Sequence, residues 1–237
     1  MSANHPAIAA ENNRGMRKIL LGETRCIVPS VPVHLIEHPL AQDALATLRD
    51  ARTDPGAFRQ TARRISVLLA LEALRDLPTI ATTVDTPLET ATVRRVAADV
   101  VVVPVLRAGL GMLDAVLDLV PGARVGHLGL QRDERTAVAS KYYSKLPPDL
   151  RDSYVLMVDP MLATGGSALT GLDLLLAEGA TNIRVVCIVS APEGIAVLHN
   201  AYPEIEIFTP AVDRELNEYK FILPGLGDFG DRLYGTH

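Results

Sequence analysis

Apolar residues in the second half of the chain gather in short continuous runs separated by amphipathic stretches. Residues 100–105 (VVVVPV) are mostly β-branched and contain no polar residue, which is typical of a strand buried on both faces. Similar runs predict strands at residues 124–130, 154–158, 183–190 and 205–208, and helical periodicity predicts helices at residues 112–119, 168–178 and 193–201. This alternation predicts an α/β fold, in which a mostly parallel, twisted sheet carries helices on both faces.

The first half of the chain is predicted to be mainly helical. Apolar positions recur at helical spacing over residues 40–48 and over residues 58–74. Residues 78–92 are rich in Thr and Pro, and no periodicity decides between helix and strand there. Because residues 1–30 lack any periodic pattern, we expect a flexible N-terminal arm followed by a single domain over residues 31–237.

A long polar segment over residues 131–153 separates two of the predicted strands. It is charged, contains Pro, and is far longer than an ordinary connection, whose median length is about 4–6 residues. We therefore expect a mobile lid loop that covers a binding site.

The composition is that of a globular protein with one sizeable core. Its 237 residues are 48% apolar, and its net charge at pH 7 is −5. Because no long run of Lys and Arg occurs, binding of duplex nucleic acid through its phosphates is not expected. The first residues lack the apolar stretch of a signal peptide, and no window reaches the length of a membrane span, so we expect a cytoplasmic protein. Cys26 and Cys187 have no metal-ligand spacing, and Cys187 is expected to be a buried apolar residue.

The segment Tyr154–Ser167 (YVLMVDPMLATGGS) has the features of an anion site. An apolar strand ends at Asp159, and a turn containing Thr164, two glycines and Ser167 leads into the next helix. The unpaired N–H groups and the positive dipole end of a helix N-terminus stabilise an anion, and Gly lets the backbone approach a phosphate closely. The alternative is an ordinary turn in which Ser167 caps the helix. No Lys follows the glycines, so the turn is not a P-loop.

This segment and three others resemble the uracil phosphoribosyltransferases, a branch of the type I phosphoribosyltransferases. The loop DPMLATGGS resembles their phosphoribosyl-diphosphate loop, with Pro160 where most type I members have a second acidic residue. The segments PVLRAGLGMLDAV, SAPEGIAVL and ILPGLGDFGDRLYGT are similar to the same family in order and spacing, from near His34 to the end of the chain. The resemblance implies a type I phosphoribosyltransferase core with a helical N-terminal part. It also implies a reaction of pyrimidine salvage, in which uracil and 5-phosphoribosyl 1-diphosphate (PRPP) give UMP and diphosphate.

The resemblance assigns roles to particular residues. The implied catalytic residues are Arg107 and Arg132, which would hold the diphosphate, and Asp159, which would face the ribose or the metal-bound diphosphate. The residues implied to bind PRPP are Arg107, Arg132, Asp159, Pro160, Met161, Leu162, Ala163, Thr164, Gly165, Gly166, Ser167 and Asp228. The residues implied to contact uracil are Ile222, Gly227, Asp228 and Phe229. Without the resemblance, Arg107 would be a strand-end cation paired with a carboxylate, and the C-terminal turn would only pack.

Cofactors and partners also follow from the resemblance. Mg²⁺ is the implied cofactor, held mainly by the PRPP diphosphate rather than by protein ligands. A homo-oligomer is implied, and GTP is implied as an effector because some family members respond to it. Phe229 stands where the family usually has a small residue, so we expect its ring to narrow the pocket edge. Leu71 replaces the tyrosine expected before Glu72.

Two alternatives from other functional classes share the same fold, because fold alone does not fix function. An RNA-binding regulatory protein would have a basic face, and the net charge of −5 counts against it. A non-catalytic oligomerisation module would have lost the loop residues. Those residues are all present in the sequence: Arg107, Asp159, Thr164, Gly165, Gly166 and Asp228.

Overall fold

A central sheet forms the middle layer of the protein. The computed structural model describes residues 33–132 and 139–236, so the predicted arm over residues 1–30 lies outside the described residues. Within them, eight strands pair in the order β1-β12-β10-β8-β4-β6-β7, with β5 beside β4. The strands are β1 (Val33–Leu35), β4 (Asp99–Leu106), β5 (Arg124–Val125), β6 (His127–Arg132), β7 (Ala139–Lys145), β8 (Ser153–Val158), β10 (Asn182–Val186) and β12 (Glu206–Thr209). Every neighbouring pair is parallel except β6 and β7, which confirms the predicted mostly parallel sheet.

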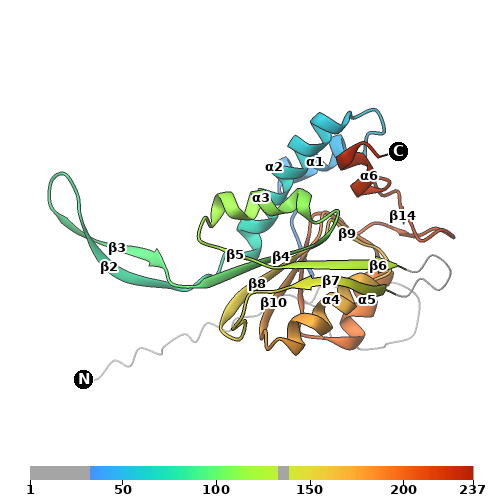
Figure 1. Cartoon of the computed structure of the whole chain (residues 1–237). Helices are drawn as coiled ribbons and strands as arrows, with labels where there is room; N and C mark the ends of the chain where they lie inside the picture. The colour runs from blue at the N-terminus through green and yellow to red at the C-terminus, as the bar shows by residue number, and fades with distance from the viewer. Residues whose placement is uncertain (1–32, 133–138, 237) are drawn as a thin grey trace, which may run out of the picture.

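Helices cover both faces of this sheet (Figure 1). One face carries α1 (Pro39–Arg49), α2 (Pro55–Ala73), α3 (Leu110–Leu119) and α6 (Phe229–Tyr234), and the other carries α4 (Gly166–Ala177) and α5 (Pro192–Ala201). Strand β4 is apolar throughout because its two faces contact two different hydrophobic cores. Val100 and Val102 belong to the core under α1–α3, whereas Val101 and Val103 belong to the core over α4 and α5. None of the described helices is both long enough and apolar enough to cross a membrane.

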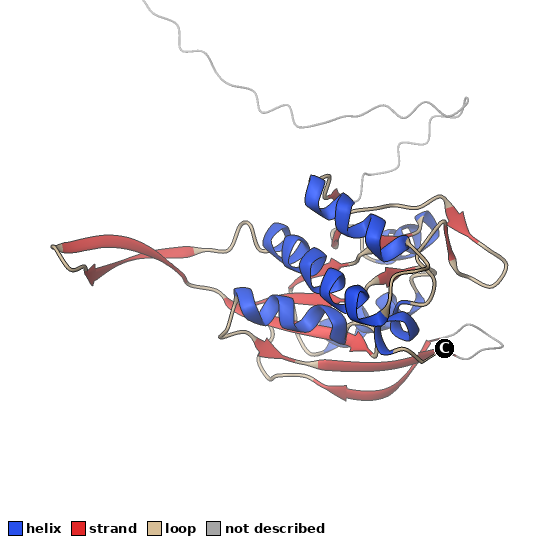
Figure 2. Cartoon of the chain, turned by 90° about the horizontal axis from the view of Figure 1, so that it is seen from above, coloured by secondary structure: helices blue, strands red, loops and turns tan. Residues whose placement is uncertain are grey.

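The N-terminal helices form where their periodicity predicted them. Asp54 caps α2 by accepting hydrogen bonds from Gly56 N at 2.8 Å and Ala57 N at 3.0 Å, and Pro55 occupies the first turn. The predicted apolar face of α2 is fully buried, with Phe58 among its largest side chains. Figure 2 shows these helices lying across the sheet as a separate layer.

The segment that the sequence could not assign forms a long β-hairpin. Strands β2 (Thr79–Asp85) and β3 (Thr90–Val96) pair in antiparallel register from Thr79↔Val96 to Asp85↔Thr90. Thr86 closes the turn, because its Oγ1 accepts from Leu88 N at 3.2 Å and Glu89 N at 3.1 Å. The hairpin projects from the body of the molecule (Figure 1), and its residues are exposed or half-buried. Because neither face is buried, its sequence lacks the alternation of apolar and polar residues that predicts a strand.

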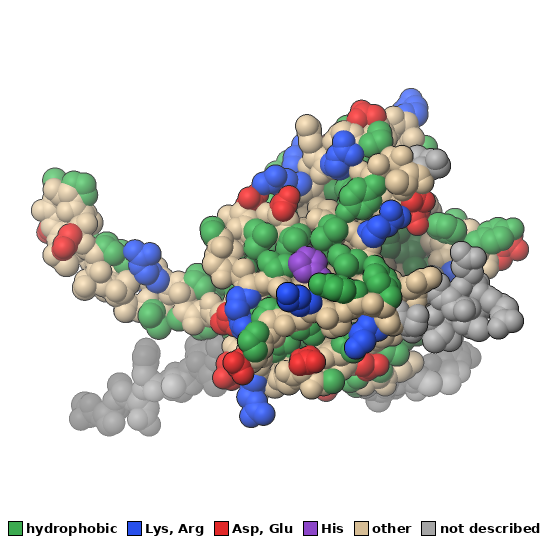
Figure 3. Space-filling view, in the orientation of Figure 1, with side chains coloured by type: hydrophobic (Ala, Val, Ile, Leu, Met, Phe, Trp, Pro, Cys, Tyr) green, Lys and Arg blue, Asp and Glu red, His purple; other side chains and the backbone are tan. Residues whose placement is uncertain are grey.

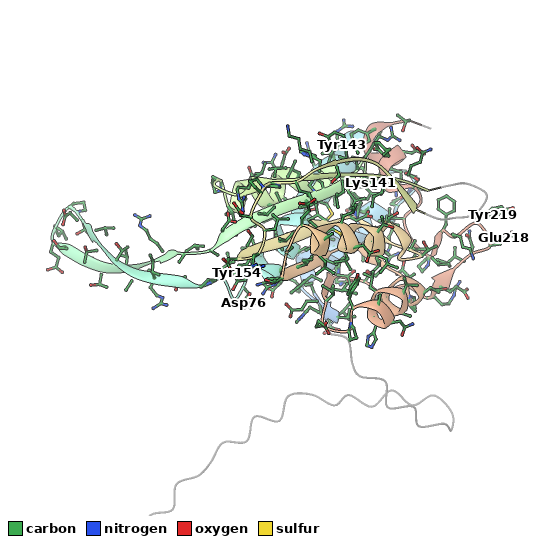
Figure 4. The ribbon with its side chains drawn as sticks, turned by 60° about the horizontal axis from the view of Figure 1, so that its bottom comes forward. Asp76, Lys141, Tyr143, Tyr154, Glu218 and Tyr219 are labelled. Carbon is green, nitrogen blue, oxygen red and sulfur yellow. The ribbon has the colours of Figure 1, made fainter. Side chains whose placement is uncertain are left out.

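The predicted lid loop is wrong for residues 139–145, which are a strand. Residues 139–145 form β7, which pairs with β6 in antiparallel register and carries the exposed Lys141 and Tyr143 (Figure 4). The following turn is fixed by Arg124, which donates to Pro148 O at 2.6 Å and to Asp149 O at 3.3 Å. Residues 133–138 lie outside the described residues, so a mobile segment there stays a prediction.

Candidate active site

The strand order reverses between β4 and β8. These strands are parallel neighbours, with Pro104 opposite Val158, but the chain continues from β4 towards β6 and from β8 towards β10 on the other side. Loops leaving such a switch point separate and open a crevice at the carboxyl ends of the strands. Arg107 follows β4 and Asp159 follows β8, so two of the predicted site residues start at the same edge of the sheet.

We define residues 159–167 as the anion loop. Helix α4 begins at Gly166, two residues before the predicted start, and Gly165 with φ +80° is its N-cap without a capping side chain. The alternative reading of Ser167 as the cap is therefore wrong, since Ser167 lies inside the first turn. Because no side chain caps them, the first N–H groups of α4 suit an anion.

The two glycines of this loop serve different purposes. A Cβ on Gly165 would lie 2.9 Å from both Gly194 O and the Cβ of Val197 on α5, so protein packing already requires glycine there. A Cβ on Gly166 would meet only Thr164 Oγ1, at 3.8 Å. Open space beside Gly166 fits the predicted close approach of a phosphate to the backbone.

A short pair of parallel strands holds the anion loop against the neighbouring segment. Strand β9 (Met161–Leu162) pairs with β11 (Val189–Ser190), and Ile188 N and Val189 N both donate to Pro160 O, at 2.9 and 3.0 Å. The single strand predicted over residues 183–190 is therefore wrong, because the chain leaves the main sheet after Val186 to hold the loop.

The C-terminal turn is held by a partly buried ion pair. Arg49 of α1 donates to both carboxylate oxygens of Asp213, at 2.8 and 2.6 Å, and to Gly225 O at 2.8 Å. Asp213 also accepts from Gly225 N at 2.8 Å. Gly225 has φ +59°, and a Cβ there would lie 2.1 Å from Ile222 O. The turn from Ile222 to Phe229 is thus a fixed backbone surface.

Asp228 and Phe229 have structural roles in this turn. Asp228 caps α6 by accepting from Asp231 N at 2.9 Å. Phe229 is 1% exposed, and its ring packs edge-on against Phe58 with the centroids 5.1 Å apart. The expectation that this ring narrows the pocket edge is therefore wrong, because the ring turns into the core and leaves main-chain atoms of the turn beside the cleft.

The anion loop and the C-terminal turn face each other across one cleft of about 320 Å³. The predicted site residues that line it are Asp159, Met161, Leu162, Ala163, Gly165, Ser167, Ile222, Gly227, Asp228 and Phe229. Pro160, Thr164 and Gly166 belong to the same loop but do not line the cleft. The structure thus brings together the residues that the sequence assigned to two different substrates.

Arg107 lies at the edge of the cleft rather than in its lining. Its side chain is 62% exposed, its Nη2 is 3.8 Å from Asp231 Oδ1, and its guanidinium lies 5.9 Å from the centre of the Tyr234 ring. The peptide bond between Leu106 and Arg107 is cis. The side chain of Arg132 lies outside the described residues, so the predicted role of Arg132 is untested.

Comparison with known proteins identifies the family. A family model described as uracil phosphoribosyltransferase matches residues 35–236. The chain belongs to the uracil phosphoribosyltransferase family. It is 48% identical over 205 residues to a uracil phosphoribosyltransferase of Streptococcus pneumoniae serotype 4 and 49% identical to one of Rhodococcus opacus, covering 86% of this chain and 98% of each relative.

Solved structures share the fold of this chain. The AQ2163 protein from Aquifex aeolicus matches with a TM-score of 0.82 and 37% identity, over 85% of this chain and 97% of that one. An adenine phosphoribosyltransferase from Leishmania donovani matches with a TM-score of 0.54 and 17% identity over 83% and 89% of the two chains, which supports the fold alone.

The charges in this uracil phosphoribosyltransferase cleft are mixed. Burial raises the pKa of the Cys187 thiol well above its ordinary value, and the negative charge of Asp159 raises it further. Cys187 is fully buried, as predicted, and stays a neutral thiol in the wall of the cleft. Asp159 and Asp228 bring carboxylates to the cleft, and Lys220 brings an ammonium group. Among the described residues, no three His, Cys, Asp or Glu side chains lie together as a metal site.

Sequence reasoning did not identify all residues of the cleft. The lining also includes Ala108, Leu130, Ala168, Cys187, Lys220, Phe221 and Gly230. Lys220 and Phe221 come from the tip of the hairpin between β13 (Glu215–Leu216) and β14 (Ile222–Leu223). The sequence signal for this hairpin is weak, because each strand has only two residues and Lys220 rather than Gly occupies the position with φ +67°.

Proposed function

We propose that this protein is a uracil phosphoribosyltransferase that converts uracil and PRPP to UMP and diphosphate. One observation carries the proposal: in a member of this family, an anion loop and a rigid backbone turn face each other across a single cleft. The reaction joins a phosphorylated sugar to a flat base, so it requires those two kinds of surface side by side.

The anion loop would bind the phosphorylated ribose of PRPP. The N–H groups at the start of α4 and the hydroxyl groups of Thr164 and Ser167 donate to phosphate oxygens, and the dipole of α4 favours the negative charge. Asp159, which accepts from Met161 N at 3.5 Å, faces the ribose from the end of β8. Arg107 would hold the diphosphate from the edge of the cleft by charge-assisted hydrogen bonds, and Arg132 is proposed to hold the same group.

The C-terminal turn would bind uracil through its main chain. The edge of the uracil ring alternates carbonyl acceptors with N–H donors, which backbone N–H and C=O groups can match. Ile222, Gly227, Asp228 and Phe229 supply those groups. Because Asp213 and Arg49 fix the turn before any ligand binds, little ordering cost remains on binding.

Mg²⁺ is part of the proposal. The two cleft carboxylates, Asp159 and Asp228, fit a hard cation that takes most of its ligands from phosphate and water oxygens. When bound, the ion supplies positive charge against the leaving diphosphate. No described cleft side chain is a strong base, so we expect a dissociative displacement in which uracil attacks as positive charge develops on the ribose.

The test is formation of UMP from uracil and PRPP, measured with cytosine, hypoxanthine and orotate as competing bases. We expect UMP formation with uracil that stops in excess EDTA and returns with Mg²⁺. Equal turnover of hypoxanthine, or full activity in EDTA, contradicts the proposal. An absence of UMP formation, with RNA bound instead, favours the RNA-binding alternative. Adding GTP to the same assay tests the effector role that the family resemblance implies.

We also propose that the protein forms a homo-oligomer. The β2–β3 hairpin projects from the body and exposes hydrophobic side chains (Figure 3), including Ile80, Leu88 in the turn, and Val96, which are 58%, 96% and 56% exposed. A two-stranded hairpin alone is marginally stable in water, so a partner surface would stabilise it. Light scattering of the purified protein tests this, and a monomer at micromolar concentration contradicts it.

A cytoplasmic location stays a prediction that cell fractionation tests.

A further inference from the structure

The first turn of α5 contacts both sides of the cleft. On one side, a Cβ on Gly194 would lie 2.5 Å from Ala163 O, so the turn lies directly against the anion loop. Ala191 N, at the N-cap of α5, donates to Leu162 O at 2.8 Å. On the other side, Glu193 Oε1 accepts from Leu216 N of β13 at 2.9 Å. Two adjacent residues of one helix turn therefore connect the loops assigned to the two substrates.

The hairpin that Glu193 contacts has a well-defined tip. Asn217 Oδ1 accepts from Tyr219 N at 3.0 Å and from Phe221 N at 2.9 Å, and Lys220 N donates to Asn217 O at 2.9 Å. Figure 4 shows Glu218 and Tyr219 at the outer end of this hairpin, away from the body. These bonds hold the tip of the hairpin together, so the contact of the hairpin with α5 helps to set where Lys220 and Phe221 enter the cleft.

We propose that Glu193 is a positioning residue that holds the β13–β14 hairpin, and with it the base side of the cleft, in register with the anion loop. This inference rests on the proposed function, because it assigns the hairpin to the uracil side. Ile222 is the first residue of β14 and lines the cleft, so a shift of β13 moves a residue expected to contact uracil. The anion loop is seated by Ala191 and Gly194 and does not depend on the Glu193 side chain.

A purely helical role for Glu193 is the competing explanation. The N-cap residue Ala191 makes no side-chain capping bond, and a carboxylate in the first turn stabilises a helix through its dipole. The two roles need different properties of the side chain. Holding Leu216 N needs the reach of the side chain and an acceptor oxygen, whereas the dipole needs negative charge.

Two conservative variants separate these properties. Glu193→Gln keeps the reach and an acceptor oxygen but loses the charge, and Glu193→Asp keeps the charge but is one methylene shorter. Glu215→Ala is a matched control, since Glu215 lies on the same hairpin and pairs with Arg214 at 3.0 Å rather than with α5. For each protein we would measure kcat, the KM values for uracil and PRPP, the melting temperature, and amide exchange at Leu216.

We expect Glu193→Asp to raise the KM for uracil about 3- to 10-fold, the effect of losing one modest hydrogen bond, and to accelerate exchange at Leu216. The KM for PRPP should stay within about twofold, and Glu193→Gln and Glu215→Ala should resemble the wild type. The inference is overturned if Glu193→Gln raises the KM for uracil as much as Glu193→Asp does. It is also overturned if Glu193→Asp leaves the KM for uracil unchanged. A wild-type protein that forms no UMP refutes the proposed function instead, and Leu216 exchange still reports whether Glu193 holds the hairpin.

Discussion

A Cβ on Gly194 would lie 2.5 Å from the carbonyl oxygen of Ala163, closer than side-chain carbons approach backbone oxygens in folded proteins. Helix α5 can therefore lie against the anion loop only because residue 194 has no side chain. The loop backbone cannot yield easily, since Ala191 N also donates to Leu162 O at 2.8 Å and β9 pairs with β11. The position of the proposed phosphate site thus depends on a residue in another helix.

Gly194→Ala should lower both stability and the use of PRPP. In an open helix position, Ala in place of Gly stabilises by about 1 kcal/mol, whereas overpacking here should cost about 1–3 kcal/mol. We expect a lower free energy of unfolding and a raised KM for PRPP. Gly122→Ala is the control, because no atom lies within 4 Å of a Cβ built there. A Gly194→Ala protein that is more stable than the wild type would show that the contact relaxes at no cost.

Gly165→Ala and Gly166→Ala should differ from each other. Gly165 has φ +80° and is crowded by α5, so Ala there should reduce the free energy of unfolding by about 1–3 kcal/mol. Gly166 is open on the protein side, so Ala there should leave the melting temperature nearly unchanged but raise the KM for PRPP by obstructing the phosphate. Thermal unfolding and steady-state kinetics on both variants check this. Equal melting temperatures, or an unchanged KM for PRPP in Gly166→Ala, would contradict the assignment.

Phe229→Ala should act mainly on stability. The ring is buried against Phe58, so removing it leaves a cavity and should cost about 3–5 kcal/mol. Phe229→Leu keeps much of the volume and should lose less stability, with a KM for uracil close to that of the wild type. Denaturant unfolding and kinetics of the two variants are the measurements. A large change in base preference in the stable Leu variant would mean that the ring contacts uracil.

Arg107→Ala should weaken the use of PRPP and leave the fold intact. The side chain is 62% exposed and its nearest carboxylate, on Asp231, is 3.8 Å away, so its removal should change stability by less than about 0.5 kcal/mol. Loss of a charge-assisted contact to diphosphate costs about 1.5–3 kcal/mol, or very roughly 10- to 100-fold in kcat/KM for PRPP. Arg75→Ala, at an exposed Arg just beyond the C-terminal end of α2, serves as the control. If uracil kinetics change and PRPP kinetics do not, Arg107 belongs to the base side.

The free energy of unfolding should decrease at acidic pH, partly because Asp76 becomes protonated. Hydrogen bonds from the buried Arg184 at 2.6 and 2.8 Å hold the pKa of the Asp76 carboxyl below its ordinary value of 3.8 (Figure 4). A lowered folded-state pKa contributes stability that is complete above the ordinary value and is lost as the pH falls through the folded-state pKa. Asp76→Asn should therefore lower the free energy of unfolding at pH 7, by only about 1 kcal/mol because Asp76 is largely exposed. In the same variant, the free energy of unfolding should decrease less steeply below about pH 4 than it does in the wild type.

Features with a local pattern could be predicted from the sequence. Strands β4 and β8 were predicted because both faces are buried and the runs are therefore apolar throughout. The anion loop was recognised because its Asp, Thr and glycines occupy one short segment. By contrast, β2 and β3 contain only exposed and half-buried residues, and β7 at the sheet edge has polar residues around two adjacent tyrosines, so none of these strands carried an apolar pattern.

The residues that position the site could not be predicted in this way. Arg49, Asp213 and Glu193 each act on backbone atoms of a distant segment, and nothing in their own neighbourhoods distinguishes them from surface charges. Phe229 was misjudged for the same reason. Its partner Phe58 is distant in sequence, so the direction of the ring depends on tertiary packing alone.

The clamp of Arg49 on the C-terminal turn has a consequence for how the site is assembled during folding. Arg49 and Gly225 are separated by 176 residues, whereas Ala191 and the Leu162 carbonyl that it holds are only 29 residues apart. Closing a longer loop costs more chain entropy, and long-range contacts form slowly. During refolding we therefore expect the anion loop to form before the C-terminal turn. The chain should pass through a compact species that protects the amides of β9 and β11 while that of Gly225 still exchanges.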